Sequence, residues 1–192
     1  MNLRPAVPRP AENPFSSGCI DTLAYRFRDG GIDSILERLG RNQDRGAIVG
    51  RHGSGKTTLL EQLADRLEGE ITWVRLNADH VHPGETARRY LPEVVDQRHV
   101  VLIDGAEQLG RWSWWRLHLR IRHAGTIIIT SHHKGRLPAL FECTTSPELL
   151  KELVSELVPD GAAAMDLEHL YERRGGNIRL CFRELYDVWA GR

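Results

Sequence analysis

A short stretch from Gly50 to Thr58, GRHGSGKTT, has the residue types and the spacing of a phosphate-binding loop. Its glycines let backbone N–H groups turn inward around an anion, and a helix that begins here adds the positive end of its dipole. We expect Lys56 to reach the β- and γ-phosphates of a nucleotide, and Thr57 to complete the coordination of a bridging Mg²⁺ ion. The residues expected to form the phosphate site are Gly50, Arg51, His52, Gly53, Ser54, Gly55, Lys56, Thr57 and Thr58.

A second polar stretch follows an apolar run. HVVLIDGAEQL ends its apolar part at Asp104 and places Glu107 three residues later. Asp104 is suited to hold Mg²⁺, directly or through water. Glu107 would lie beyond the end of a strand, where a carboxylate can orient and deprotonate an attacking water molecule. An acidic residue in such a turn is also a common helix cap, and these residues alone leave both roles open for Glu107.

The surrounding pattern predicts the elements that position these side chains. Five short runs, GAIVG, ITWVRLN, HVVLID, GTIIIT and LFECTT, are rich in Val, Ile, Leu and Thr and alternate with helix-like or polar stretches. Such alternation favours an α/β fold, with a parallel sheet covered by helices on both faces. The phosphate loop lies between the first run and the amphipathic segment TTLLEQLADRL. GIDSILERLGRN also reads as a short amphipathic helix.

Three segments are predicted along the chain. Residues 1–22 contain four prolines and read as an extended arm. Residues 23–145 hold the five strand-like runs and form the nucleotide-binding domain. Residues 146–192 contain only helical patterns, beginning with SPELLKELVSELVPD, and form a small helical subdomain with further helices broken at Gly175 and Gly176.

Composition sets broad limits on the function. Acidic and basic residues balance at 26 each, so no global field draws the chain toward nucleic acid or an anionic membrane. No apolar run has the length of a signal sequence or a bilayer span, and we expect a cytoplasmic protein with no membrane partner. Cys19, Cys143 and Cys181 are widely separated, and we expect buried free thiols.

The additional run ITWVRLN, between the phosphate loop and Asp104, makes the chain resemble the additional-strand, catalytic-glutamate division of P-loop NTPases, and within it the AAA+ ATPases. The resemblance extends from about Asn13 to the carboxy terminus. It implies a P-loop NTPase three-layer sandwich with a helical lid, ATP and Mg²⁺ as cofactors, and Glu107 as the catalytic base. Asn77 matches the polar residue that can hold this glutamate inactive in AAA+ proteins, although an Asn here is equally suited to a turn.

The resemblance also assigns sensor residues. TIIITSHH occupies the position of the sensor 1 strand, where Thr130, Ser131 and His132 are the candidates, with Ser131 taken as the catalytic one. The usual residue there is Asn, which leaves the choice open. A metal site at His132 and His133 is disfavoured, because no carboxylate or Cys lies at close spacing.

RRGGNIR resembles the sensor 2 region in the lid of origin-recognition-type AAA+ proteins. If Asn177 caps the following helix, Arg179 lies in its first turn, where a cation is disfavoured unless an anion lies opposite. A γ-phosphate is one such anion. The alternative is an exposed Arg179 paired with Glu172 or Asp187.

In many ring-forming AAA+ proteins an arginine just before the fifth strand projects into the site of the neighbouring subunit. The corresponding run here, LPALFECTT, contains no arginine. The nearby candidates for such an arginine finger are Arg136, Arg120 and Arg122.

The leading hypothesis is a module that binds and slowly hydrolyses ATP with Mg²⁺, and signals its nucleotide state to a protein partner or to another copy of itself. One alternative is an ATP-bound scaffold that docks to protein or nucleic acid through GRWSWWRLHLRIRH. Tryptophans at helical spacing more often fill a core, so nucleic-acid binding there is not favoured. A small-molecule kinase is less consistent with the extra strand and Glu107, and no guanine-reading stretch supports a GTPase.

Overall fold

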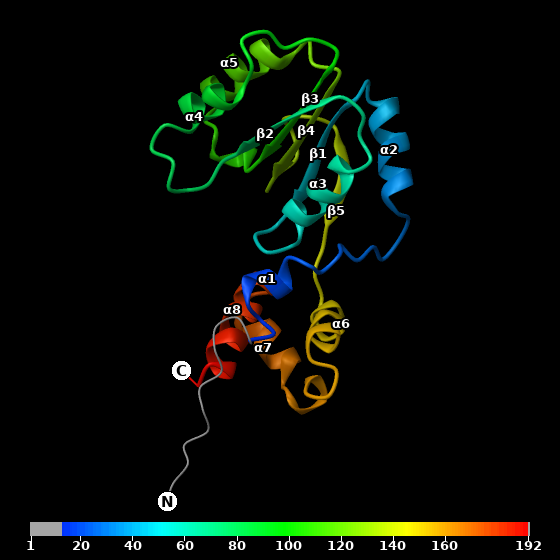
Figure 1. Ribbon diagram of the computed structural model, residues 1–192, viewed down its shortest axis with the longest axis vertical. Helices are drawn as coiled ribbons and strands as arrows, with labels where there is room; N and C mark the ends of the chain where they lie inside the picture. Colours follow the sequence, from blue (N-terminus) through cyan, green and yellow to red (C-terminus); the bar gives the residue numbers. More distant parts are fainter. Residues whose placement is uncertain (1–12, 192) are drawn as a thin grey trace, which may run out of the picture. The chain divides into compact units, whose positions relative to one another are not determined.

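The computed structural model describes residues 13–191. Its centre is a five-stranded sheet in which every pair of neighbours is parallel, in the order β2-β3-β4-β1-β5 (Figure 1). All five runs rich in Val, Ile, Leu and Thr are strands, which confirms the predicted α/β sheet. The strands are β1 (Arg45–Gly50), β2 (Glu70–Arg75), β3 (His99–Asp104), β4 (Thr126–Ser131) and β5 (Ala139–Cys143).

Helices cover both faces of this sheet. Helices α2 (Ile32–Arg41) and α3 (Lys56–Ala64) contact β1, and α3 also contacts β3 and β4. Helices α4 (Pro83–Tyr90) and α5 (Arg111–Ile121) pack against each other and share a separate apolar core with the strands. Strands buried on both faces read as nearly continuous apolar runs, which is why their pattern shows little alternation.

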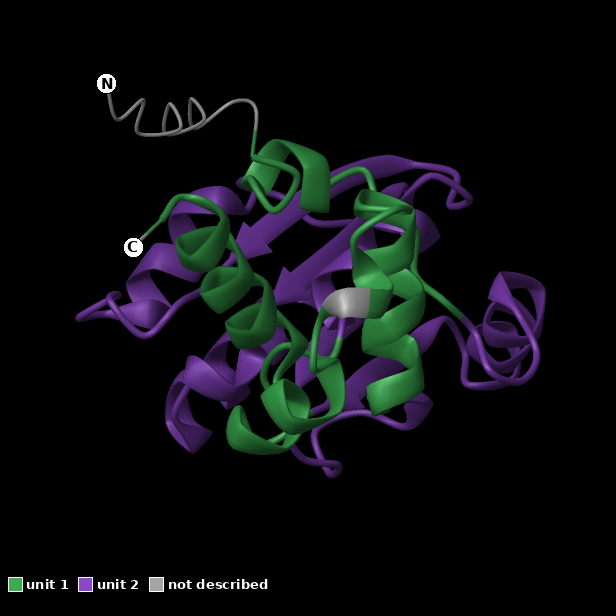
Figure 2. Cartoon of the chain, turned by 90° about the horizontal axis from the view of Figure 1, so that it is seen from below, with its two compact units in different colours: residues 1–26, 51–54, 144–192 green, residues 27–50, 55–143 purple. Residues whose placement is uncertain are grey.

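The chain divides into two compact units (Figure 2). The sheet unit contains residues 27–50 and 55–143. The helical unit contains the described residues up to 26, the loop residues 51–54 and the residues from 144 onward. Its helices are α1 (Ser17–Ile20), α6 (Pro147–Leu157), α7 (Leu167–Arg173) and α8 (Ile178–Trp189). Short 3₁₀ turns are η2 (Ala106–Gln108) in the sheet unit and η3 (Ala162–Ala164) in the helical unit.

The amino-terminal segment differs from the extended arm expected for residues 1–22, of which 1–12 lie outside the described residues. Ser17–Ile20 form the short helix α1. Phe15 is buried and stacks on Phe182 of α8, with ring centroids 6.3 Å apart. The side chain of Asn13 donates a hydrogen bond to the Tyr186 carbonyl at 2.9 Å. An apolar anchor and a side-chain amide therefore fix a segment that its prolines alone suggest is extended.

The tryptophans of α5 also differ from the expectation that they fill the core. Trp114 is half-buried and packs against the α4–α5 core. Trp112 is 79% exposed and Trp115 is 54% exposed. The buried side chains of α5 are Leu117 and Ile121 instead. The indoles of Trp112 and Trp115 are therefore exposed to solvent.

No helix in residues 13–191 is long and apolar enough to cross a bilayer.

The three cysteines are free, as expected, but their burial differs. Cys143 and Cys181 are buried, and Cys19 is half-buried. Burial raises the pKa of the Cys181 thiol to about 11, which keeps it protonated at neutral pH. We predict that Cys19 reacts first with an aromatic disulfide reagent at pH 8 and that Cys181 reacts only on unfolding. Thiol titration of Cys19→Ser should show no fast phase, and a fast phase that survives this change would contradict the assignment.

Candidate nucleotide site

The phosphate loop joins β1 to α3. Gly53 and Gly55 adopt positive φ angles of 71° and 84°, which favour glycine. Lys56 is the first residue of α3, and its side chain is turned back so that Nζ donates to the Gly50 carbonyl at 2.8 Å. Burial lowers the pKa of Lys56, and the charges of Glu107, Cys143 and Asp104 oppose this only in part. The loop thus carries a poorly solvated cation, which an incoming phosphate would stabilise.

Asp104 connects the loop to the strand beside it. Thr57 Oγ1 donates to Asp104 Oδ2 at 2.8 Å, and Thr130 Oγ1 donates to Asp104 Oδ1 at 2.6 Å. The Thr130 oxygen in turn accepts from the Gly105 N–H at 2.8 Å. Asp104 and Thr130 lie at the carboxyl ends of the paired strands β3 and β4, which meet at one edge of the sheet. The structure therefore brings together Thr57 and Asp104, the two residues expected to hold Mg²⁺.

Glu107 lies on η2, immediately beyond Asp104. Its Oε1 is 2.9 Å from Nε2 of His132, and both side chains are about one-fifth exposed, at 18% and 19%. Its Oε2 is buried and has no hydrogen-bond partner within the described part of the chain. One carboxylate oxygen thus lies against the His132 ring, without a hydrogen bond between them, while the other is left with its hydrogen-bonding capacity unused.

The three sensor 1 candidates have three different partners. Thr130 binds Asp104, and His132 contacts Glu107. Ser131, the residue expected to be catalytic, is buried, and its Oγ accepts from the His133 N–H at 3.4 Å. Sequence reasoning considered His132 but did not select it. The signal that could have selected it is the alternation of side chains along a strand, which gives Thr130 and the residue two positions later the same face.

Asn77 is exposed and forms a turn. Its Oδ1 accepts from the Asp79 N–H at 3.2 Å, and its backbone N–H donates to the ring of His80. The structure does not bring the Asn77 amide to Glu107. This geometry favours the turn-forming alternative for Asn77.

Two of the three candidate arginine fingers are held within the sheet unit, whereas the side chain of Arg122 is exposed and hydrogen-bonds to the adjacent His123. Arg136 donates to the Leu109 carbonyl, and its guanidinium lies 5.3 Å from the centre of the Trp114 ring. Burial lowers the pKa of Arg136, and the charge of Glu107 offsets part of this. Arg120 donates to the Pro92 carbonyl at 2.9 Å. Arg136 is therefore an internal brace for residues 132–138, which join β4 to β5 without a helix.

In the helical unit, Asn177 caps α8 as expected. Its Oδ1 accepts from the Leu180 N–H at 3.1 Å, which places Arg179 in the first turn. Arg179 is exposed, and within residues 13–191 it forms no ion pair with Glu172 or Asp187. Gly53 belongs to the same unit, and a Cβ added to it would lie 2.0 Å from Asn177 Oδ1. The loop tip and the start of α8 are thus in close contact.

The donor set fits a magnesium nucleotide. A threonine hydroxyl and a carboxylate are the hard oxygen ligands that Mg²⁺ prefers. Ser54 Oγ is buried without a hydrogen-bond partner in the described residues, as is Glu107 Oε2. A phosphate oxygen and a water molecule would satisfy these two atoms. No cluster of three or more His, Cys, Asp or Glu side chains in the described chain could hold a metal ion by itself.

Gly105 is required between Asp104 and Glu107. Its φ is 84°, and an added Cβ would lie 2.2 Å from the Leu76 carbonyl oxygen. We predict that Gly105→Ala destabilises the protein by about 2–4 kcal/mol, because it combines backbone strain with a clash against main chain. Urea unfolding measures this. Gly110→Ala is the matched control, since its φ is −64° and an added Cβ meets nothing within 4 Å. Equal unfolding midpoints for the two variants would contradict the prediction.

Comparisons with known proteins show similarity in structure but not in sequence. No family model matches the chain, and no curated protein matches it. Among solved structures it is similar to a mutant of RuvB from Thermotoga maritima, with a TM-score of 0.52 and 18% sequence identity. The match covers 82% of this chain and 62% of that chain. The chain has the α/β fold of the P-loop NTPases, with a five-stranded parallel sheet. At this identity the likeness shows the fold alone.

Proposed function

We propose that this protein is an ATP-binding AAA+ module that hydrolyses ATP with Mg²⁺ and couples its nucleotide state to a protein partner or to another copy of itself. The observation that carries the proposal is the arrangement of two acids. Asp104 is bound to the hydroxyl of Thr57, while Glu107, three residues later, keeps a buried carboxylate oxygen without a partner. A scaffold that only binds ATP needs Asp104 to hold Mg²⁺, but it does not need Glu107 as a general base.

Each residue has a defined task in this proposal. Lys56 leaves the Gly50 carbonyl to bind the β- and γ-phosphates, and the loop N–H groups surround them. Thr57 and Asp104 would hold Mg²⁺, which when bound neutralises charge on the phosphate oxygens. Glu107 Oε2 accepts a proton from the attacking water, and His132 fixes the carboxylate through Oε1. His132, rather than Ser131, is therefore the residue that we assign to positioning the base.

The proposal extends to the lid. RRGGNIR resembles the sensor 2 region of the origin-recognition branch, and Arg179, exposed in the first turn of α8, forms no ion pair within residues 13–191. Gly53, at the tip of the phosphate loop, lies next to this turn. We assign Arg179 to sensing the γ-phosphate, so that loss of this phosphate is signalled to the partner.

Steady-state phosphate release tests this function. We expect slow turnover that requires Mg²⁺ and disappears with EDTA, because Arg136, one of the candidate arginine fingers, is held internally. The assay is run over a range of protein concentrations. Specific activity that rises with concentration indicates that another copy completes the site. ATP binding without phosphate release at any concentration would contradict hydrolysis and favour the scaffold.

A further inference from the structure

The outer surface of α4 and α5 carries an unusual mixture of aromatic and basic side chains. Trp112, Trp115 and Leu119 follow one another at helical spacing along α5 and are 79%, 54% and 42% exposed. The two indoles contact each other edge to face, with ring centroids 6.1 Å apart. Large apolar side chains gathered on a surface mark an interaction site more often than scattered ones do.

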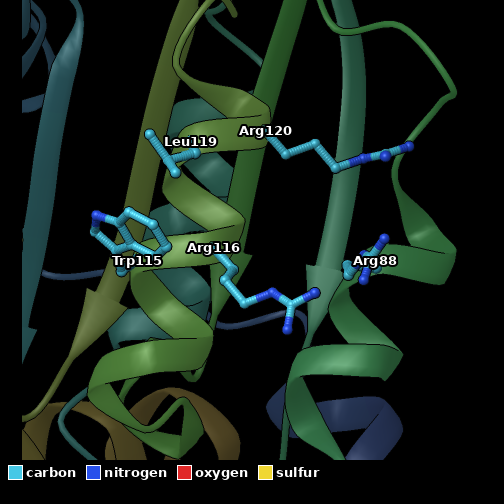
Figure 3. Close-up of a pocket in the computed structure, with 5 residues that line it drawn as sticks. All are labelled: Arg88, Trp115, Arg116, Leu119 and Arg120. Carbon is cyan, nitrogen blue, oxygen red and sulfur yellow. The ribbon is translucent and has the colours of Figure 1, made fainter.

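Three arginines line the same hollow as Trp115 and Leu119. Arg116 and Arg120 extend from α5 toward α4, where Arg88 lies, while Trp115 and Leu119 project from the other side of α5 (Figure 3). Together these five residues line a hollow of about 400 Å³. We call this the α4–α5 surface.

The positive charge of this surface is not neutralised by the protein. Around α5, from Gln108 to Phe141, the sequence contains no Asp or Glu, although the chain as a whole has a net charge of zero; α4, which carries Arg88, also contains Glu85. Within the described residues, none of the arginines lining the hollow takes part in an ion pair, whereas exposed arginines elsewhere pair with acids, as Arg66 does with Asp33 and Arg75 with Glu61. An unneutralised group of cations on an otherwise balanced protein is the electrostatic signature of an anionic ligand.

One of these arginines also has an unsatisfied donor. Arg120 binds the Pro92 carbonyl through one terminal nitrogen, which fixes the guanidinium at the hollow. Its Nε is buried and has no hydrogen-bond partner in the part of the chain that the structure describes. A phosphate oxygen, which accepts hydrogen bonds strongly, would satisfy this donor.

We propose that the α4–α5 surface binds single-stranded nucleic acid, with phosphates at Arg88, Arg116 and Arg120 and unpaired bases stacked on Trp115 and Trp112. The combination of cations and exposed rings decides the ligand class. A phosphate chain alone would use the arginines but not the indoles. A single-stranded nucleic acid uses both, because each nucleotide presents a flat base to stack and a phosphate to neutralise. The proposal concerns a surface separate from the phosphate loop and does not depend on ATP hydrolysis.

Fluorescence anisotropy with a labelled oligothymidylate, measured on the full chain at low salt without nucleotide, tests the proposal. We expect Trp115→Ala to weaken binding about tenfold, in keeping with the loss of one stacked base, and to leave the salt dependence unchanged. Arg116→Ala should weaken binding and reduce the slope of log K against log [salt] by about 0.7. Both side chains are exposed, so neither change should alter the thermal unfolding midpoint.

Arg41→Ala is the matched control. Arg41 is an exposed arginine on α2, and this change should leave oligonucleotide affinity unaltered. Absence of binding at low salt, or equal binding by the wild type and both α5 variants, would overturn the proposal. So would tighter binding of a polyglutamate peptide than of the oligonucleotide, which would indicate an acidic protein partner. A duplex that binds as well as the single strand would overturn the role of base stacking.

Discussion

Replacing Glu107 with glutamine is expected to lower kcat for ATP hydrolysis by about 10²–10⁴-fold, the usual contribution of a positioned general base. Glutamine has nearly the same shape and keeps an oxygen for the contact with His132, but it cannot accept a proton from water. ATP affinity should remain within about threefold, because in our proposal Glu107 binds the attacking water and not the phosphates. Steady-state phosphate release and binding of a fluorescent ATP analogue measure the two quantities.

Glu142→Gln is the matched control for this variant. Glu142 lies on β5 and pairs at the surface with Lys134, so its loss removes a carboxylate without touching the site. This control should hydrolyse ATP at the wild-type rate. Equal turnover by Glu107→Gln and the control would show that Glu107 is not the base.

The second large effect is expected from Lys56→Met. Loss of the ammonium removes at least one charge-assisted hydrogen bond to phosphate, worth about 1.5–3 kcal/mol, so the Kd for ATP should rise by about 10- to 150-fold. The same change should leave the unfolding midpoint without nucleotide unchanged or higher. Burial disfavours the charged lysine in the folded state, and methionine fills the space without a charge.

The lowered pKa of Lys56 gives this prediction a pH dependence. The unfavourable burial of the ammonium acts at every pH below the lowered pKa and disappears as the pH rises toward 10.5, the ordinary pKa of lysine, where the unfolded chain also loses its proton. Wild-type stability should therefore gain from this group at alkaline pH, and Lys56→Met should lack that gain.

Differential scanning fluorimetry with and without ATP follows both effects of Lys56→Met. Lys151→Met, at a half-exposed lysine of α6, is the control and should keep the shift of the midpoint by ATP. A normal ATP-induced shift in Lys56→Met would show that the loop does not hold the phosphates.

Much of the fold follows directly from local pattern. The five apolar runs predict the five strands because both faces of a parallel sheet are buried. The GRHGSGKTT stretch and Asp104 are recognisable because phosphate binding constrains residue type and spacing together. The cap of α8 is predictable for a similar reason, since Asn177 must satisfy an N–H of the same helix.

The rest depends on contacts between distant residues. The contact of His132 with Glu107 requires β4 to pair with β3 in the observed register, with Ile103 opposite Ile129. Alternation along β4 gives Thr130 and His132 the same face, but the pairing of β4 with β3 decides that His132 is the one that contacts Glu107 of η2. The exposure of Trp112 and Trp115 depends likewise on the direction in which α5 meets α4, which the sequence of α5 alone does not specify.

Single-turnover hydrolysis of ATP in ¹⁸O-labelled water, with protein in excess, tests the central claim most directly. Attack by a water molecule at the γ-phosphorus places one solvent oxygen in each phosphate that is released. Our account predicts labelled phosphate from the wild type with Mg²⁺ and almost none from Glu107→Gln, although both proteins bind ATP. Bound ATP that yields no phosphate with the wild type, or labelled phosphate formed equally fast by Glu107→Gln, would contradict it.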